Sequence, residues 1–389
     1  MKKIVTLVMI MLLAVTFVFS AAACSIDTGT GGPDKPDVKP EENPDAEVHL
    51  TVGTLGKSAE QSVMQEWINA FQKKNPEVSI KITKNMSGMA EIINWTSAGE
   101  LPDIVWTAGD QHSPYSGTGY FQDLSDESKF PGNEEFFSDF YDALIDSTHY
   151  SSSDETAFEQ AGVAVPSNDW TWEDFLKTCD DLMKAGVKKA IEWKKWRPVY
   201  ATMLANYGGE YLDAEGNFAL DSDEAKACYE FYEEFYDTRT GYAISGEGAS
   251  FKAYSGELSS AVPMIVDVRP QLPDYVQTAY SRQWSLTARA FPNFVQKDGS
   301  AGKVGTGCSG YGITKACTDE TKREWAWKFL KWCMSEEGYD TVAYLGNIVP
   351  AITTMRESGA WTEYTYGGIT VDYEAFIADN TEDIFLNYY

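Results

Sequence analysis

The fold is decided by the stretch His49-Leu-Thr-Val-Gly53 and by the two short apolar runs that follow it along the chain. The second run, Val78 to Ile82, is apolar at every other position, and the third is Ile104-Val105-Trp106. Apolar residues three and four positions apart predict a helix over 58–74, and another helix is expected over 86–98. The order strand, helix, strand, helix, strand begins an α/β layer with a parallel sheet.

Ligands of such layers bind beyond the carboxyl ends of the parallel strands. This rule predicts that residues 53–56 and 107–111 lie at the mouth of a cleft. Thr171, followed three residues later by Asp174, is typical of a helix start. Beyond the first layer, the sequence predicts helices over about 171–185, 221–236 and 319–334, and strands at 264–267 and 309–313.

The first residues carry the pattern of an export signal. Lys2-Lys3 precedes an apolar run and three alanines, which end directly before Cys24. This arrangement resembles a bacterial lipobox, in which the cysteine receives lipid and begins the mature protein. We therefore expect a signal peptide over 1–23 and a lipid anchor on Cys24, on the extracytoplasmic face of the membrane.

An ordinary signal peptide followed by a chance cysteine is the alternative to the lipobox. A transmembrane anchor is disfavoured, because the apolar run is shorter than the roughly 20 residues that span a bilayer. The segment 24–47 is rich in Gly, Pro, Asp and Glu and poor in large apolar residues, so we expect a flexible linker.

The composition narrows the class of partner. The 389 residues carry a formal net charge of −28 without a basic cluster, which excludes nucleic acid as a partner. The chain holds 12 Trp and 22 Tyr, a surplus that suits recognition of flat, partly apolar ligands. No cysteine pair shows C-x-x-C spacing, so we expect no metal and no cofactor, and we interpret the cysteines after Cys24 as buried small apolar residues: Cys179, Cys228, Cys308, Cys317 and Cys333.

Several ordered segments together resemble the extracellular solute-binding proteins of ABC importers, the family that includes maltose- and oligosaccharide-binding proteins. The segments are Leu101 to Trp106 with Asp110, Phe158 to Pro166 with Trp170 to Phe175, Asn206 to Glu210 with Asp213 to Gly216, Ser255 to Asp267, and Ala326 to Gly338. The resemblance implies two α/β lobes of the periplasmic-binding-protein kind, joined by a hinge, with the ligand in the cleft between them. It also implies a monomer that binds a carbohydrate and delivers it to the permease subunits of an ABC transporter.

The resemblance implies an N-terminal lobe over 48–150 plus 309–352 and a C-terminal lobe over 151–308 plus 353–389. The chain departs from the family near 145–156, where the strand that crosses between the lobes is expected to be missing. Family members also continue further than Tyr389. These departures favour, as an alternative, a surface lipoprotein of the same fold that no longer transports.

A neutral sugar needs aromatic faces for its C–H surfaces and planar polar groups for its hydroxyls. For the first lobe we select Trp106, Asp110 and Gln111, of which Asp110 matches a family position that often contacts ligand. Trp106 is equally well interpreted as a core residue, and Asp110 as a helix cap. For the second lobe, Trp193 and Trp196 are selected for stacking, with packing between helices as the alternative.

Three further residues are expected at the ligand. Asp267 and Arg269 follow a predicted strand where the resemblance places a cleft loop, although Arg269 can simply pair with Asp267. Tyr311 follows a glycine-rich strand entry and can face the cleft.

A secreted glycoside hydrolase is the alternative from another class, since it also combines aromatic residues with carboxylates. The sequence contains no nucleophile motif, H-E-x-x-H or phosphate loop, so we expect no enzyme activity. A peptide or polyamine as the bound solute stays open.

Overall fold

A computed structural model of the protein carries side chains for most of the chain after the predicted linker. The residues that it describes are 43–56, 58–108, 119–138, 149–195, 197–213, 215–245, 251–252, 255–268, 271–294, 302–306, 309–348, 352, 355, 362–372 and 381–385. Cys24, the linker up to residue 42, Asp110, Gln111, Trp196 and Arg269 therefore lie outside the described residues.

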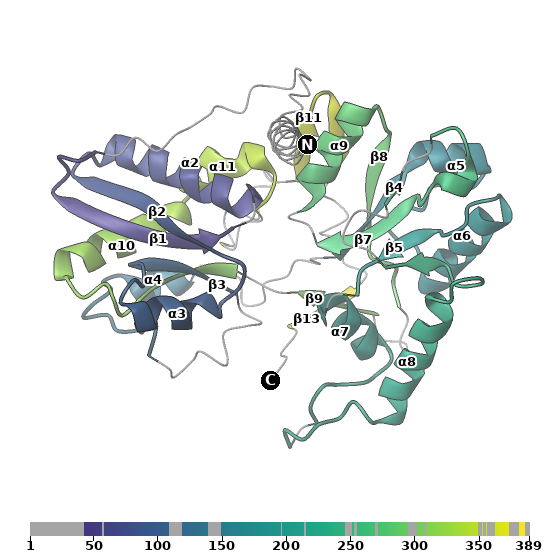
Figure 1. Ribbon diagram of the computed structural model, residues 1–389, viewed down its shortest axis with the longest axis horizontal. Coiled ribbons are helices and arrows are strands. Elements are labelled where there is room, and N and C mark those ends of the chain that lie inside the picture. Colours follow the sequence, from purple (N-terminus) through teal and green to yellow (C-terminus); the bar gives the residue numbers. More distant parts are fainter. Residues whose placement is uncertain are drawn as a thin grey trace, which may run out of the picture. The chain divides into compact units, whose positions relative to one another are not determined.

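The first sheet is the layer predicted from residues 49–106. Its strands run in the order β10-β3-β1-β2, with bounds β1 (Val48–Leu55), β2 (Val78–Met86), β3 (Ile104–Ala108) and β10 (Ser309–Ile313). β1 pairs in parallel with both β2 and β3, whereas β10 is antiparallel to β3. A strand from late in the sequence thus completes the sheet that the first residues begin (Figure 1).

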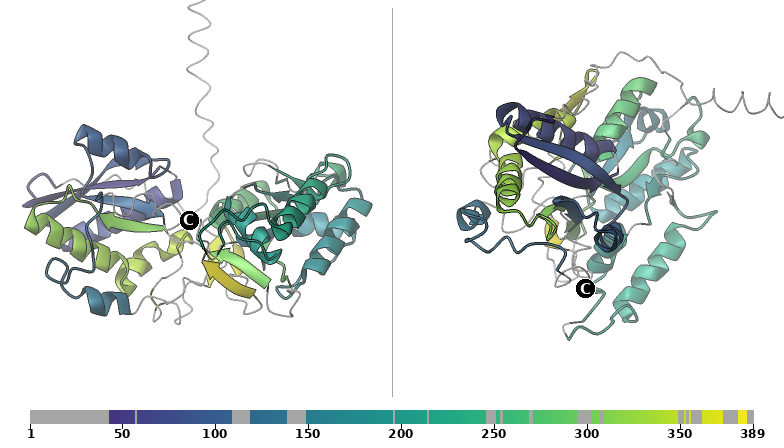
Figure 2. Two further views of the ribbon diagram at one scale, coloured as in Figure 1. Left: turned by 90° about the horizontal axis from the view of Figure 1, so that it is seen from below. Right: turned by 60° about the vertical axis from the view of Figure 1, so that its left-hand side comes forward.

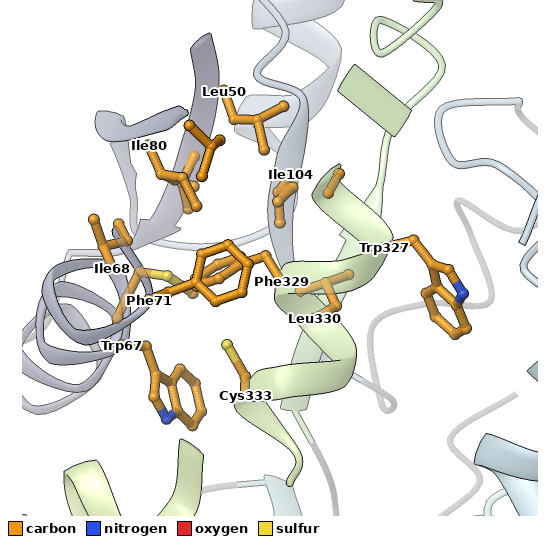
Figure 3. Packing of buried hydrophobic residues seen from close by; sticks show 14 of the residues in the cluster. Leu50, Trp67, Ile68, Phe71, Ile80, Ile104, Trp327, Phe329, Leu330 and Cys333 are labelled. Atoms are coloured by element: carbon orange, nitrogen blue, oxygen red, sulfur yellow. The ribbon is translucent and has the colours of Figure 1, made fainter. Parts of the chain in front are cut away.

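Helices cover both faces of this sheet (Figure 2). They are α2 (Ser58–Lys74), α3 (Glu91–Ala98), α4 (Asn133–Ser138), α10 (Glu320–Cys333) and α11 (Glu336–Val342). On one face, Leu50, Ile80 and Ile104 pack against α2 and α10 (Figure 3). The rings of Phe71 on α2 and Phe329 on α10 lie 5.1 Å apart at the centre of this core. On the other face, Val105 packs against α3.

The second sheet has five strands in the order β6-β5-β7-β4-β8. Their bounds are β4 (His149–Asp154), β5 (Ile191–Trp193), β6 (Ala243–Ile244), β7 (Met264–Val268) and β8 (Leu286–Ala290). β5 is parallel to β6 and β7, and β4 is antiparallel to β7 and β8. The associated helices are α5 (Glu155–Ala161), α6 (Trp172–Lys184), α7 (Arg197–Asn206), α8 (Asp223–Phe235) and α9 (Leu272–Arg282).

Smaller elements complete the described part of the chain. Strands β9 (Gly302–Thr306) and β13 (Thr381–Phe385) form a parallel pair, and β11 (Glu363–Tyr366) with β12 (Ile369–Asp372) form an antiparallel hairpin. Two short 3-10 helices span Leu258–Ser260 and Ala343–Leu345.

Local sequence signals placed several helix ends correctly. Thr171 and Asp174 form the expected reciprocal capping box at the start of α6. The Ser222 side chain accepts a hydrogen bond from the Ala225 backbone at the start of α8, and Asp319 does the same for α10. The predicted strand at 309–313 agrees with β10 in both bounds.

Near 145–156, where the strand that crosses between the lobes was expected to be missing, residues 149–154 form β4 of the second sheet. This segment, His-Tyr-Ser-Ser-Ser-Asp, is too polar to be recognised as a strand from its composition. It is a strand because both its edges are hydrogen-bonded, Ser151 lying opposite Val266 of β7 and Arg289 of β8. Pairing on both sides outweighs the weak local preference.

Four cysteines are confirmed as buried free thiols: Cys179, Cys228, Cys317 and Cys333. Burial raises the pKa of Cys228 and of Cys317 to about 12. These groups behave as small apolar residues, as the absence of paired spacing predicted. Cys308 lies outside the described residues.

Candidate functional site

At the carboxyl edge of the first sheet, a pair of neutral hydroxyl groups joins two strands. β1 and β3 are parallel and end here, and β10 begins here because it runs in the opposite direction. The Thr54 Oγ1 and Tyr311 Oη atoms lie 2.7 Å apart, so the hydrogen bond links β1 to β10 across β3. Burial raises the pKa of Tyr311, which keeps its hydroxyl protonated.

Trp106 lies beside Tyr311 in the strand register and is mostly buried. The pair Tyr311 and Trp106 is antiparallel, and the indole belongs to the cluster that also contains Leu55 and Val105. Its exposed fraction is 7%, so most of the ring serves the core of the first layer. The structure therefore favours the core interpretation for most of this side chain, while its strand ends at the edge where ligands of parallel sheets bind.

At the carboxyl edge of the second sheet, three charged side chains are buried together. Asp267 Oδ2 accepts hydrogen bonds from Lys194 Nζ at 2.5 Å and from Tyr275 Oη at 2.6 Å. The side chain of Lys194 is 5% exposed and that of Asp267 is 0% exposed, so this ion pair is shielded from water. Glu192 is also fully buried, and its Oε2 accepts from the backbone N–H of Phe251 at 2.6 Å.

Strand alternation explains which side chains meet at this edge. Ile191 and Trp193 of β5, and Met264 and Val266 of β7, belong to one hydrophobic cluster. Ile265 belongs to the cluster on the other side of the sheet. Because successive residues point to opposite faces, Glu192, Lys194 and Asp267 share the face of Ile265.

Trp193 is a core residue, and the prediction that it stacks on ligand is not supported by its position. It is fully buried, and its ring lies 5.2 Å from that of Phe235 and 5.7 Å from that of Phe175. Packing between elements, the alternative considered for this residue, is what the structure shows. Its backbone still contributes to the edge, since the Trp193 carbonyl accepts from Tyr236 Oη at 2.5 Å.

The sequence analysis found Asp267 but missed Glu192, Lys194 and Tyr275. It noted that Arg269 can pair with Asp267, whereas Lys194 makes that ion pair in the described residues. The available signal was the pattern Glu192-Trp-Lys194, in which two charged residues flank an aromatic residue on a short strand. In a strand covered on both faces, that pattern requires the two charges to be buried together and compensated.

The described polar groups at each edge are hydrogen-bonded to one another. Within the described ranges, no three His, Cys, Asp or Glu side chains are arranged to hold a metal ion. No helix in the part of the chain that the structure describes is long and apolar enough to cross a membrane.

A separate hollow of about 470 Å³ lies at the opposite end of β4 and β8, lined by Glu155, Trp284, Thr287 and Thr370 among others.

The comparisons with known proteins agree with this architecture. The family model described as "Bacterial extracellular solute-binding protein" matches residues 56–340. A receptor named GacH from Streptomyces glaucescens GLA.O, solved unliganded and in complex with acarbose, is 17% identical with a TM-score of 0.65. The match covers 87% of this chain and 88% of that one.

Two further solved structures show the same likeness. UgpB from Mycobacterium tuberculosis, in complex with glycerophosphocholine, is 17% identical with a TM-score of 0.64, covering 86% of each chain. The MalE domain from Bdellovibrio bacteriovorus, bound to maltotriose, is 18% identical with a TM-score of 0.62, covering 80% of this chain and 83% of its own. The predicted fold class, two α/β lobes of the periplasmic-binding-protein kind, is confirmed.

Proposed function

Because the chain belongs to the bacterial extracellular solute-binding protein family, we propose that it binds a carbohydrate and delivers it to an ABC transporter permease. The observation that carries this proposal is the family match over residues 56–340, joined to buried polar groups at the carboxyl edges of both sheets. Lobe closure about a hinge brings the two edges to opposite sides of the ligand. The protein acts by binding, and no chemical step is assigned to it.

The lobes follow from the two sheets. The first lobe includes β10 from late in the chain, as the expected boundaries 48–150 plus 309–352 require. Those boundaries also assign the first residues of β4 to this lobe, although β4 pairs within the second sheet. We therefore place the first boundary before His149. The second lobe takes the segment from β4 to β8, together with the hairpin of β11 and β12, whose Tyr364 and Val371 pack against Leu286 and Ala288 of β8.

The proposed ligand contacts combine aromatic and planar polar groups. On the first lobe they are Trp106, Asp110, Gln111 and Tyr311, and on the second lobe Trp196 and Arg269. Asp267, whose side chain is 0% exposed, is not among the proposed contacts. Support comes from Trp106 and Tyr311, which lie opposite each other at the carboxyl edge of the first sheet, where parallel sheets hold their ligands. Trp196 follows two residues after Lys194 and is the proposed stacking residue.

A calorimetric titration and a thermal-shift screen against mono- and oligosaccharides test the function. A sugar that binds only the folded state, at a hundredfold excess over its dissociation constant, stabilises the protein by about 2.7 kcal/mol. We expect one sugar class to raise the melting temperature, and Trp196→Ala to lose that binding while keeping a cooperative transition. A cooperative wild-type transition that no sugar moves would overturn carbohydrate as the solute, and release of reducing sugar from a polymer would instead favour the hydrolase.

We also propose that lipid on Cys24 anchors the protein to the extracytoplasmic face of the membrane, with residues 24–47 as the linker. Cys24→Ser is then expected to move the protein from the membrane fraction to the soluble fraction of a bacterial host. A substituted protein that still sediments with membranes and extracts only into detergent would contradict the anchor. Ala23 and the signal peptide stay unchanged in this variant, so export itself is preserved as the control.

A further inference from the structure

We propose that Lys194, Asp267 and Tyr275 act as a positioning network that holds the carboxyl ends of β5 and β7 together at the sheet edge where the ligand is proposed to bind. The inference rests on the proposed function and goes beyond it by assigning a role to Lys194 and Tyr275. None of the three needs to touch the ligand. Their task is to hold two neighbouring strand ends in one relative position.

The strand register brings the two charges together. β5 and β7 pair in parallel with Ile191 opposite Met264, Glu192 opposite Ile265 and Trp193 opposite Val266. The next pair in the same register is Lys194 and Asp267, whose side chains make the 2.5 Å ion pair. The ion pair therefore extends the sheet by one step, at the point where β5 ends and the chain turns toward α7.

A helix is tied to the same carboxylate. Tyr275 lies on α9, the helix that follows β7, and its hydroxyl donates to the oxygen of Asp267 that also accepts from Lys194. The Asp267 carboxylate thus joins the end of β7 to α9 and to the residue that follows β5. Burial and the Asp267 charge raise the pKa of Tyr275, so the hydroxyl keeps the proton that it donates.

The end of β5 is also held from its other side. Tyr236, just after α8, donates to the Trp193 carbonyl, and Lys195 Nζ lies 4.4 Å from the centre of the Tyr236 ring. Residues 193–195 are therefore each held in place, Trp193 and Lys195 by Tyr236 and Lys194 by Asp267. A binding site is precise only when the elements that carry it are held in place, and these contacts hold the end of β5.

Stability alone does not account for a buried ion pair at this position. Removing two charges from water is costly, and well-packed apolar residues of similar volume often serve a protein's stability as well or better. The best-attested use of such pairs is to specify one geometry. At the carboxyl edge of a parallel sheet, the geometry that matters is that of the loops that hold ligand.

The test compares stability with affinity in the purified full-length protein. The variants are Lys194→Met with Asp267→Leu combined, Tyr275→Phe alone, and Lys177→Met as a control for loss of an exposed lysine paired with Asp181. Each is titrated by calorimetry with maltotriose and with the sugars of the thermal-shift screen, and each is unfolded in urea. The combined variant removes both charges of the ion pair together with the acceptor of Tyr275, so its stability is expected to match that of Tyr275→Phe.

We expect the combined variant to bind the sugar roughly tenfold more weakly or worse, the cost of about one misplaced hydrogen bond, at the same stability as Tyr275→Phe. Tyr275→Phe is expected to show a smaller loss of affinity, and Lys177→Met none. If the combined variant and Tyr275→Phe both bind like the wild type, the network is only structural and the proposal is overturned. If the combined variant does not fold, Tyr275→Phe decides alone. Failure of the wild type to bind any sugar instead overturns the proposed function, and this inference falls with it.

Discussion

The carboxyl edges of the two sheets join their strands with opposite kinds of polar contact. The first edge uses a neutral pair, Thr54 and Tyr311, whose hydroxyls lie 2.7 Å apart. The second edge uses a carboxylate, Asp267, that accepts from a buried ammonium and a phenol. A neutral hydroxyl pair loses little when one partner is removed, whereas a buried charge without its partner is costly. The two edges should therefore differ sharply in their response to single substitutions.

The largest effect is expected for Asp267→Leu alone. This substitution leaves Lys194 buried without the carboxylate that neutralises it, and breaking a buried ion pair costs about 3–5 kcal/mol of unfolding free energy. Urea denaturation of the purified protein measures the loss. Lys177→Met, which removes an exposed i,i+4 ion pair, is the matched control and should change the free energy of unfolding by less than about 1 kcal/mol.

Addition of Lys194→Met to Asp267→Leu provides the second arm of this test. Replacement of both charges should recover the part of the lost stability that comes from burying Lys194 without its carboxylate, leaving the loss of the Tyr275 hydrogen bond. A single Asp267→Leu variant as stable as the wild type would mean that the contrast between the two edges is wrong.

In the first lobe, the sequence predicted an element well where the signals for that element lie within its own segment. The helix predicted over 58–74 is α2 to the residue, because its apolar spacing and the Asn75-Pro76 that follows are contained within one segment. The helix predicted over 86–98 begins only at Glu91, since β2 extends to Met86 through pairing with β1. Hydrogen bonds to a neighbouring strand decide that boundary, and they cannot be seen in the segment itself.

Two failures have the same cause. β4 was not recognised because three serines give no apolar pattern, and the strand depends on partners more than 100 residues later in the sequence. The sequence predicted no helix directly after the one over 319–334, yet Ser335 caps α11, accepting from the Gly338 backbone N–H. Serine followed by two acids is compatible with either a helix end or a helix start, and the packing of α11 on α2 selects the start.

Of the candidate site, the sequence located Asp267 and Tyr311 at sheet edges but misinterpreted Trp193. Trp193, which lies beside lysines, was expected to stack on the ligand. Because side chains alternate along a strand, Trp193 instead points to the same face as Ile191, which is the core. The same alternation places Lys194 on the opposite face, where it meets Asp267. The short β5 gives too few residues for its buried faces to be assigned without the neighbouring β7.

A matched pair of substitutions sharpens the comparison at smaller energies. Tyr275→Phe removes a hydrogen bond to a charged acceptor and is expected to cost about 1.5–3 kcal/mol of unfolding free energy. Tyr311→Phe removes a bond between neutral hydroxyls and is expected to cost about 0.5–1.5 kcal/mol. Both changes delete one oxygen from the same kind of side chain, so urea denaturation of the two variants compares the edges directly. Equal costs would mean that the charge on Asp267 adds nothing to its bond with Tyr275.

The smallest expected effect concerns the same two variants at alkaline pH. We expect their free energies of unfolding to change equally with pH. Burial raises the pKa of both Tyr275 and Tyr311, so in each case the unfolded chain releases the phenol proton first. The stability that depends on these protons is complete below about pH 10, the ordinary tyrosine value, and is lost as the pH rises toward the folded-state pKa. Each Phe variant should therefore lose less stability than the wild type between pH 9 and pH 11. The loss should be reduced by the same amount in both variants. In this window the slope depends on ionisation in the unfolded chain, where the two tyrosines are alike. If the free energy of unfolding of one variant fell more steeply with pH than that of the other, the tyrosine replaced in the steeper variant would not contribute to the pH dependence. Water would then reach the hydroxyl of that tyrosine in the folded wild-type protein.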